Sequence, residues 1–203
     1  KRNLLEIYQL EKDWQKAIDI AKELPGAASQ KEIAEYFCEL AAAEIMRSKP
    51  AEAKDYLAQA TQQNRKCVRA SLLLGDALLQ EGELERAIEA WQRIEQQDPN
   101  YLALAAQRLL EAFRKLERRS EGIALLRGYL EHYPSLDLLD VVYQLVLEDE
   151  GDAAAYRLVR DELQRNPTLV GLEKLMGARL ALTTPEMRPD IEMAKTIVQS
   201  YTK

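Results

Sequence analysis

The sequence has few of the residues from which most active sites are built. Among 203 residues it has two Cys, one His, eight Gly and seven Pro. Acid–base catalysis and metal binding need His, Cys or carboxylate side chains clustered at fixed spacing. No Cys-x-x-Cys pair, phosphate-binding glycine loop or Gly-x-Ser-x-Gly elbow occurs. The sequence therefore predicts that this chain is not an enzyme and holds no catalytic, cofactor-binding or metal-binding residue.

A long hydrophobic run is also missing. No apolar stretch approaches the roughly 18 residues that a membrane-spanning helix requires, and residues 1–6 lack the apolar core of a signal peptide. Val, Thr and Phe are sparse, which argues against β-sheet. Ala, Leu, Glu, Gln, Arg and Lys dominate, and these residues enter a helix at little conformational cost. The composition therefore predicts an all-α fold.

Positive charge is in the minority. Lys and Arg number 28 against 34 Asp and Glu, so the formal net charge is −6. Such a chain repels a phosphate backbone, so nucleic acid is not an expected partner. The expected partner is a soluble protein. The two cysteines, Cys38 and Cys67, lie 29 positions apart within strongly helical sequence. We interpret them as small buried hydrophobic residues of a protein from a reducing compartment.

What the sequence does contain is a repeat with a period of about 34 residues. A small residue recurs at separations of 36, 34, 35 and 33, and a second residue, usually bulky, follows each one four positions later. This pattern is typical of the tetratricopeptide repeat, a pair of helices in which the small residue lets the second helix approach the first closely. The small residues are Ala17, Ala53, Ala87, Gly122 and Ala155, the partners are Ala21, Leu57, Trp91, Leu126 and Val159, and the first-helix anchors are Leu4, Leu40, Leu74, Leu109 and Val142.

The clearest unit runs from residue 74 to residue 99. It has a Leu-Gly pair in the first helix, a small and then a bulky residue in the second, and a terminating Pro99. Gly82 and Gly151 stand in the turns between paired helices, where a left-handed backbone suits glycine. A sixth, less regular pair is expected, with helices at about 168–182 and 189–203 and an interruption at 183–185.

These observations predict one array rather than several domains. Each helix pair buries its apolar face only against its neighbours, so residues 1–203 are expected to form a single cooperative, right-handed superhelix of about five to six pairs. Ten to twelve antiparallel helices are expected. The first helices should line a concave groove, and the outward positions that we select as candidate protein-binding residues are Arg69, Asp76, Gln80, Gln107, Arg108, Glu111, Arg114, Lys115, Asp140 and Gln144.

Several other residues have both a structural and a functional interpretation. The basic stretch 114–119 is either a solvated helix end, where cations complement the helix dipole, or a docking patch for an acidic segment. The single histidine, His132, is expected to cap the last carbonyls of a helix rather than to act in catalysis. Trp91 is expected in the core, and Trp14 is expected to staple adjacent helices.

Three stretches carry a more specific resemblance. They are LLEIYQ at 4–9 with EKDWQKAID at 11–19, YFCELA at 36–41, and LQRNPT at 163–168 with LM at 175–176. They resemble the lipopolysaccharide assembly protein B (LapB, or YciM) family of Gram-negative bacteria over nearly the whole chain.

The resemblance implies an adaptor at the cytoplasmic face of the inner membrane. Such a protein has an N-terminal membrane helix, cytoplasmic repeats and a C-terminal rubredoxin-like knuckle of two Cys-x-x-Cys pairs that binds iron or zinc. It restrains lipopolysaccharide synthesis by promoting degradation of the deacetylase LpxC by the membrane-anchored protease FtsH, and it answers to the sensor YejM (LapC). The resemblance transfers no binding residue within the repeats.

The chain departs from this family pattern in two respects. It has neither the membrane helix nor a Cys-x-x-Cys pair, so we expect it to be part of a longer protein whose metal knuckle lies elsewhere. Any membrane association would then pass through the N-terminal helix alone. The alternative function is a generic peptide-binding scaffold or co-chaperone, and the sequence leaves open whether the protein is a monomer or a homodimer.

Overall fold

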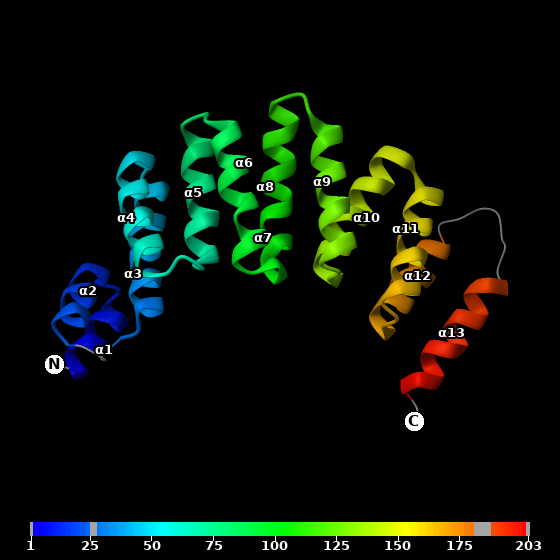
Figure 1. The fold of residues 1–203 in the computed structure, drawn as a ribbon, viewed down its shortest axis with the longest axis horizontal. Coiled ribbons are helices and arrows are strands. Elements are labelled where there is room, and N and C mark those ends of the chain that lie inside the picture. Colours follow the sequence, from blue (N-terminus) through cyan, green and yellow to red (C-terminus); the bar gives the residue numbers. More distant parts are fainter. Residues whose placement is uncertain (1, 25–27, 181–187, 202–203) are drawn as a thin grey trace. The chain divides into compact units, whose positions relative to one another are not determined.

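The structure is a computed structural model that describes residues 2–24, 28–180 and 188–201 (Figure 1). Within these ranges the chain forms α-helices and one 3-10 turn, and the described residues contain no strand. This confirms the all-α, tetratricopeptide-type fold class. No helix among the described residues is long and apolar enough to cross a membrane.

The helices follow one another in pairs. Only Arg93 separates α6 from α7, so these two form one interrupted second helix, and the described part then has twelve helices, within the predicted ten to twelve. The bounds are α1 Arg2–Glu11, α2 Trp14–Glu23, α3 Gln30–Met46, α4 Pro50–Gln63, α5 Val68–Gln80, α6 Leu84–Gln92, α7 Ile94–Gln97, η1 Pro99–Tyr101, α8 Leu102–Lys115, α9 Arg119–His132, α10 Leu136–Glu150, α11 Asp152–Arg165, α12 Leu169–Leu180 and α13 Arg188–Tyr201.

The sixth pair agrees with its expected position. Its first helix, α12, lies within the expected range 168–182, and α13 begins one residue before the expected range 189–203. The interruption expected at 183–185 lies outside the described residues. By their internal contacts the helices divide into two compact units, residues 1–122 and 123–203, which we call the N-terminal and C-terminal units. The single cooperative array over 1–203 stays a prediction.

The repeat register is visible in the burial of the core. The small residues Ala17, Ala53, Ala87 and Ala155 are completely buried, and Gly122 is buried too. Their partners four positions later, including Ala21, are also buried. A small residue and a second residue one helical turn later are therefore buried together in the second helix of each of the five pairs, as the repeat register predicts.

Trp91 shows how tightly one of these contacts is fitted. Its side chain is 0% exposed, and its indole Nε1 donates a hydrogen bond to the backbone oxygen of Leu72 at 3.1 Å. The indole lies directly against Gly75, where an added Cβ would be only 2.1 Å from Nε1. Position 75 of the repeat is therefore a glycine because the tryptophan ring occupies the space that a side chain would need.

The turns between paired helices share one left-handed residue. Gly82 adopts φ 78° and Gly151 adopts φ 81°, as their chemistry predicts, but three side-chain-bearing residues adopt nearly the same angle. In four of the five turns the amide of this residue donates to the carbonyl three positions earlier and the next amide to the carbonyl five positions earlier, which is the Schellman pattern. The three residues that are not glycine, and that a search for turn glycines therefore misses, are Lys12 (58°), Ser48 (58°) and Glu117 (59°).

Candidate functional site

Ion pairs join consecutive first helices, and they involve the residues selected for the groove. Arg69 of α5 reaches back to α3, where its Nη1 lies 2.7 Å from Glu39 Oε1 and 3.4 Å from Glu35 Oε2. The two carboxylates are on one face of α3 because they are four positions apart. Arg69 therefore lies on a first helix, and its charge is neutralised by carboxylates of the preceding first helix.

The next contact between first helices, the seam of α5 and α8, has an ion pair that is held by two hydrogen bonds. Arg108 Nε donates to Asp76 Oδ1 at 2.7 Å and Nη2 donates to Asp76 Oδ2 at 3.2 Å, so the guanidinium holds the carboxylate at two points. Its Nη1 also donates to the backbone oxygen of Leu104 at 2.8 Å. Both side chains remain partly exposed, so the pair contributes at most about 1 kcal/mol. The pair connects α5 and α8 across 32 residues of sequence.

The C-terminal unit repeats this arrangement. Lys174 of α12 forms an ion pair with Asp140 of α10. The same ammonium lies over the ring of Tyr143, 5.6 Å from its centroid. Asp140 is therefore also engaged with the next first helix. In each unit, at least one pair of charged residues that includes a candidate links neighbouring first helices.

The remaining candidates divide into engaged and free side chains. Gln80 donates from Nε2 to the backbone oxygen of Ile45 at 3.3 Å, and Lys115 pairs with Glu111 at 3.0 Å along α8. The exposed side chains of three candidates have no hydrogen bond or ion pair with any residue that the structure describes: Gln107, Arg114 and Gln144. Gln107 and Arg114 lie in the N-terminal unit and Gln144 in the C-terminal unit. A single groove containing all ten stays a prediction.

The basic stretch 114–119 is largely paired with acidic neighbours. Arg118 lies 2.6 Å from Glu85 and 2.7 Å from Glu121, and its guanidinium lies over the ring of Phe113 at 5.5 Å. The hydrogen bond to Glu121 raises the pKa of Arg118 further above its ordinary value. Within this stretch, Arg114 is the cation most available to an acidic partner.

Two single residues have the structural roles expected of them. The ring of Trp14, at the start of α2, stacks on Tyr36 of α3 at 5.7 Å with an interplanar angle of 18°, so it staples adjacent helices. Gln9 of α1 donates a hydrogen bond to the hydroxyl of the same Tyr36. Burial raises the pKa of this hydroxyl. His132 donates from Nδ1 to the backbone oxygen of Gly128 at 2.8 Å, which caps the end of α9.

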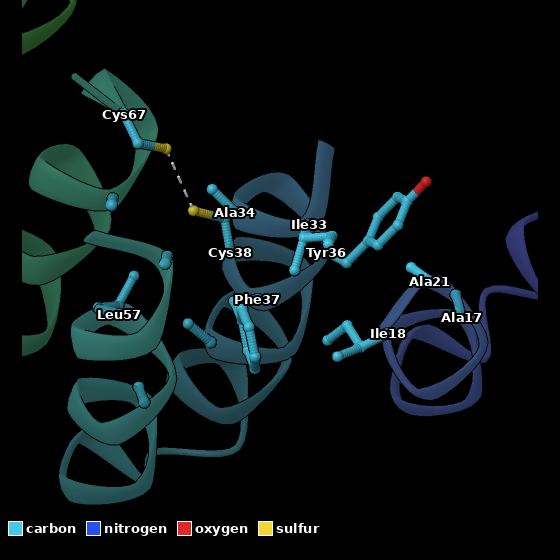
Figure 2. Close-up of a cluster of buried hydrophobic side chains, with 14 of the residues drawn as sticks. Ala17, Ile18, Ala21, Ile33, Ala34, Tyr36, Phe37, Cys38, Leu57 and Cys67 are labelled. Atoms are coloured by element: carbon cyan, nitrogen blue, oxygen red, sulfur yellow. Dashed lines mark hydrogen bonds between the residues drawn. The ribbon is translucent and has the colours of Figure 1, made fainter. Parts of the chain in front are cut away.

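The cysteines are buried, as predicted, but they are also neighbours, which the sequence did not reveal. Figure 2 shows Cys38 of α3 facing Cys67, with the two sulfur atoms 3.7 Å apart. The hydrogen bond with Cys67 and burial raise the pKa of the Cys38 thiol. Over the described ranges, no group of three or more His, Cys, Asp or Glu residues is arranged to hold a metal ion.

A pocket of about 710 Å³ opens at the N-terminal ends of α3, α5 and α8, and we call it the N-terminal pocket. Sequence reasoning found only Arg69 among its residues. The available signal was the repeat register, because residues 35, 69 and 104 occupy equivalent positions of three consecutive first helices. The residues used below to describe it are Lys31, Glu35, Lys66, Arg69, Tyr101 and Leu104.

The comparisons with known proteins agree with this architecture. The sequence model of the tetratricopeptide repeat family matches residues 38–101. Lipopolysaccharide assembly protein B of Escherichia coli (strain K12) is 29% identical over 182 residues, which are 88% of this chain and 47% of the relative. The protein of the same name from Haemophilus influenzae is 26% identical, over 91% of this chain and 53% of its own length. The chain is a tetratricopeptide-type protein similar to lipopolysaccharide assembly protein B. It spans about half the length of these curated relatives.

Solved structures with a similar helix arrangement include two bacterial proteins. MamA from Desulfovibrio magneticus RS-1 matches at 15% identity and a TM-score of 0.45, over 82% of this chain and 93% of its own. A thermophilic TPR protein of Thermus thermophilus matches at 18% identity and a TM-score of 0.46, over 86% and 94%.

The tetratricopeptide match encloses three of the ten candidate residues. Its range, 38–101, contains the whole of α4 to η1, and with them Arg69, Asp76 and Gln80. In this type of repeat each pair contacts its neighbours and the first helices present one continuous surface. The ion pairs of α3 with α5 and of α5 with α8, and the N-terminal pocket, all lie at first helices of the N-terminal unit.

Proposed function

We propose that this chain forms the protein-binding repeats of an adaptor that restrains lipopolysaccharide synthesis. The adaptor presents the deacetylase LpxC to the protease FtsH, and degradation of the deacetylase limits synthesis. The observation that carries this proposal is the similarity of 88% of the chain to lipopolysaccharide assembly protein B of Escherichia coli. An adaptor needs a rigid surface and no chemistry of its own, and paired helices joined by ion-paired seams supply such a surface.

The proposal assigns different tasks to different parts of the protein. These repeats lie at the cytoplasmic face of the inner membrane and bind partners, and the sensor YejM (LapC) modulates that binding. The membrane helix and an iron- or zinc-binding knuckle belong to other parts of the protein. Cys38 and Cys67 do not form the two Cys-x-x-Cys pairs of such a knuckle. No step of the proposal therefore passes through a metal in this chain.

Within the repeats, we assign partner contact first to the free side chains of α8. Gln107 and Arg114 lie seven positions apart, two helical turns, and so share one face of α8. Arg is prominent among residues that dominate interface energies. The other groove candidates support this surface through their mutual pairs, because a side chain already bound to its neighbour loses that interaction if it turns to a partner.

The test uses a Gram-negative strain that lacks its own lipopolysaccharide assembly protein B. The full-length gene that encodes this chain is expected to restore fast turnover of the deacetylase, measured as its half-life after synthesis is stopped. Arg114→Glu should lengthen that half-life, whereas Arg93→Glu, an exposed charge reversal on the second helix of the third pair, should not.

Two outcomes contradict different parts of the proposal. If the protein accumulates in folded form and turnover is not restored, the assigned function is wrong. If turnover is restored and Arg114→Glu behaves as the unmodified protein, the function stands and the contact surface on α8 is wrong. Circular dichroism of each purified variant separates both results from misfolding.

A further inference from the structure

The N-terminal pocket combines residues from three consecutive repeats. Glu35, Arg69 and Leu104 occupy equivalent positions of α3, α5 and α8, at separations of 34 and 35 residues. Because the repeats stack in register, these positions come together at one end of the first helices. The pocket lies wholly within the N-terminal unit. It is therefore a product of the repeat and not of a single loop.

The lining contains two positive charges that the protein leaves unpaired. Arg69 is held by Glu35 and Glu39, and the carboxylate of Asp98 accepts hydrogen bonds from Asn100. By contrast, the ammonium groups of Lys31 and Lys66 have no ion pair or hydrogen bond with any described residue. No side chain caps the start of α5, so the positive end of that helix adds to the same field. The lining has three cations, Lys31, Lys66 and Arg69, and two carboxylates, Glu35 and Asp98, so its net charge is +1 in a chain of net charge −6.

The other wall of the pocket is apolar. Tyr101 is 48% exposed and Leu104 is 51% exposed, both among the large hydrophobic side chains that the fold leaves uncovered. Leu72 and Val68 continue this surface and are half-buried. An aromatic and an aliphatic side chain next to unpaired cations are suited to a ligand that has one apolar and one anionic group.

The size of the pocket limits its occupant. Its volume of about 710 Å³ is in the range of pockets that bury a small ligand, which corresponds to a few side chains of a partner. We propose that the N-terminal pocket binds a short extended segment of a partner protein in which a carboxylate side chain stands next to a large apolar side chain. Lys31 and Lys66 meet the carboxylate, and Tyr101 and Leu104 meet the apolar side chain. This inference rests on the protein-binding part of the proposed function and not on the lipopolysaccharide pathway.

Three fluorescein-labelled peptides test the chemistry by fluorescence anisotropy with the purified protein. The first, GSDDLFGS, carries both features; GSKKLFGS reverses the charge, and GSDDSSGS removes the apolar side chains. The first is expected to bind at least about tenfold more tightly than either of the others. Its affinity should fall as salt rises from low ionic strength, because exposed charges are screened beyond about 8 Å at 0.15 M.

Matched variants locate the binding. Lys66→Glu and Leu104→Ser are each expected to weaken binding of GSDDLFGS about fivefold or more. The control for charge is Arg93→Glu, and the control for an exposed leucine is Leu169→Ser, which lies in the first turn of α12 and is 47% exposed. Both controls should bind as the unmodified protein does. The double variant Lys31→Glu with Lys66→Glu should reverse the preference and favour GSKKLFGS.

The proposal is overturned if none of the peptides binds at 1 mM, if charge and apolar content make no difference, or if the pocket variants and the controls behave alike. Tighter binding of a single-stranded oligonucleotide than of GSDDLFGS would also overturn it. The assay contains neither protease nor deacetylase, so its result is independent of the turnover test. Thermal unfolding by circular dichroism establishes that each variant is folded.

Discussion

The first and third helix pairs follow the same repeat pattern but differ in the residue that follows the small one. In the third pair, α5 to α7, Trp91 fills the slot beside the small residue and is completely buried against Gly75. In the first pair, α1 and α2, the equivalent slot holds only Ala21. Both helices of this pair instead contact the buried Tyr36 of α3, because Trp14 of α2 stacks on its ring and Gln9 of α1 donates to its hydroxyl.

This difference shows that the repeat fixes the size of the small residue but not the size of the residue four positions later. The small residue must be small wherever two helices meet closely, and Ala17 and Ala87 are both 0% exposed. The partner can vary as long as other side chains supply the lost contact. Figure 2 shows Ile18 and Ala21 on the side of α2 that faces α3, in the same apolar cluster as Tyr36. Both ion-paired seams of the N-terminal unit involve α5 of the third pair.

The largest effect is expected at the tryptophan slot. Trp91→Ala should lower the free energy of unfolding by about 3–5 kcal/mol, because it removes a large buried side chain and leaves a cavity. Ala21→Gly, in the equivalent slot of the first pair, should cost only about 1 kcal/mol through helix propensity. Urea unfolding followed by circular dichroism measures both, and equal losses at the two slots would contradict the comparison.

The next effect concerns the glycine beneath the tryptophan. Gly75→Ala places a methyl group where the indole ring lies, so it should destabilise the protein by about 1–3 kcal/mol despite the better helix propensity of alanine. In a Trp91→Leu background the same change should be nearly neutral, and the two changes should therefore be strongly non-additive. Additive losses in the double-mutant cycle would mean that the ring does not set the size of residue 75.

A smaller effect is expected from the aromatic staple of the first pair. Trp14→Ala removes the stack on Tyr36, which is worth about 0.5–1.5 kcal/mol beyond the buried area. Trp14→Phe keeps an aromatic ring and should recover most of the loss. The fluorescence of the tryptophans cannot serve as the probe here, so thermal unfolding by circular dichroism is the measurement. If alanine and phenylalanine have the same effect, the stack of Trp14 on Tyr36 does not stabilise the protein.

The smallest effects should appear in the turns, with opposite signs. Glu117→Gly should stabilise the protein by up to about 1 kcal/mol, because glycine adopts a positive φ without the steric cost that a side chain incurs. Gly82→Ala should destabilise it by about 1 kcal/mol for the same reason, although nothing lies within 4 Å of the added methyl group. The same sign of change at both positions would show that strain in the left-handed turn is not the cause.

Much of the fold could be predicted because the repeat has a sequence period. The spacing from Ala17 to Ala155 identified the helix contacts, and Gly82 and Gly151 identified two of the turns. Lys12, Ser48 and Glu117 could not be identified from their chemistry, since their conformation follows from their place in the repeat. Counting four or five residues back from each small residue reaches all five turn residues.

Less of the candidate site could be predicted, because it depends on pairs of residues that are far apart in the sequence. Outward position on a first helix identified Arg108 and Asp76, but not that they bind one another across 32 residues. The neighbouring thiols of Cys38 and Cys67 have the same origin. Whether such side chains meet depends on the crossing of consecutive first helices, which a repeat length alone does not determine.

The central claim is that the first helices of the N-terminal unit bind the partners of this protein. Photo-crosslinking in cells tests it most directly, with benzoylphenylalanine in place of the half-exposed Tyr101 in one full-length variant and of Arg93 in another. Crosslinked products are identified by mass spectrometry. We expect the probe at position 101 to capture the deacetylase or the protease, and the probe at 93 to capture neither. Capture from position 93 alone, or from neither position in folded protein, would contradict the account.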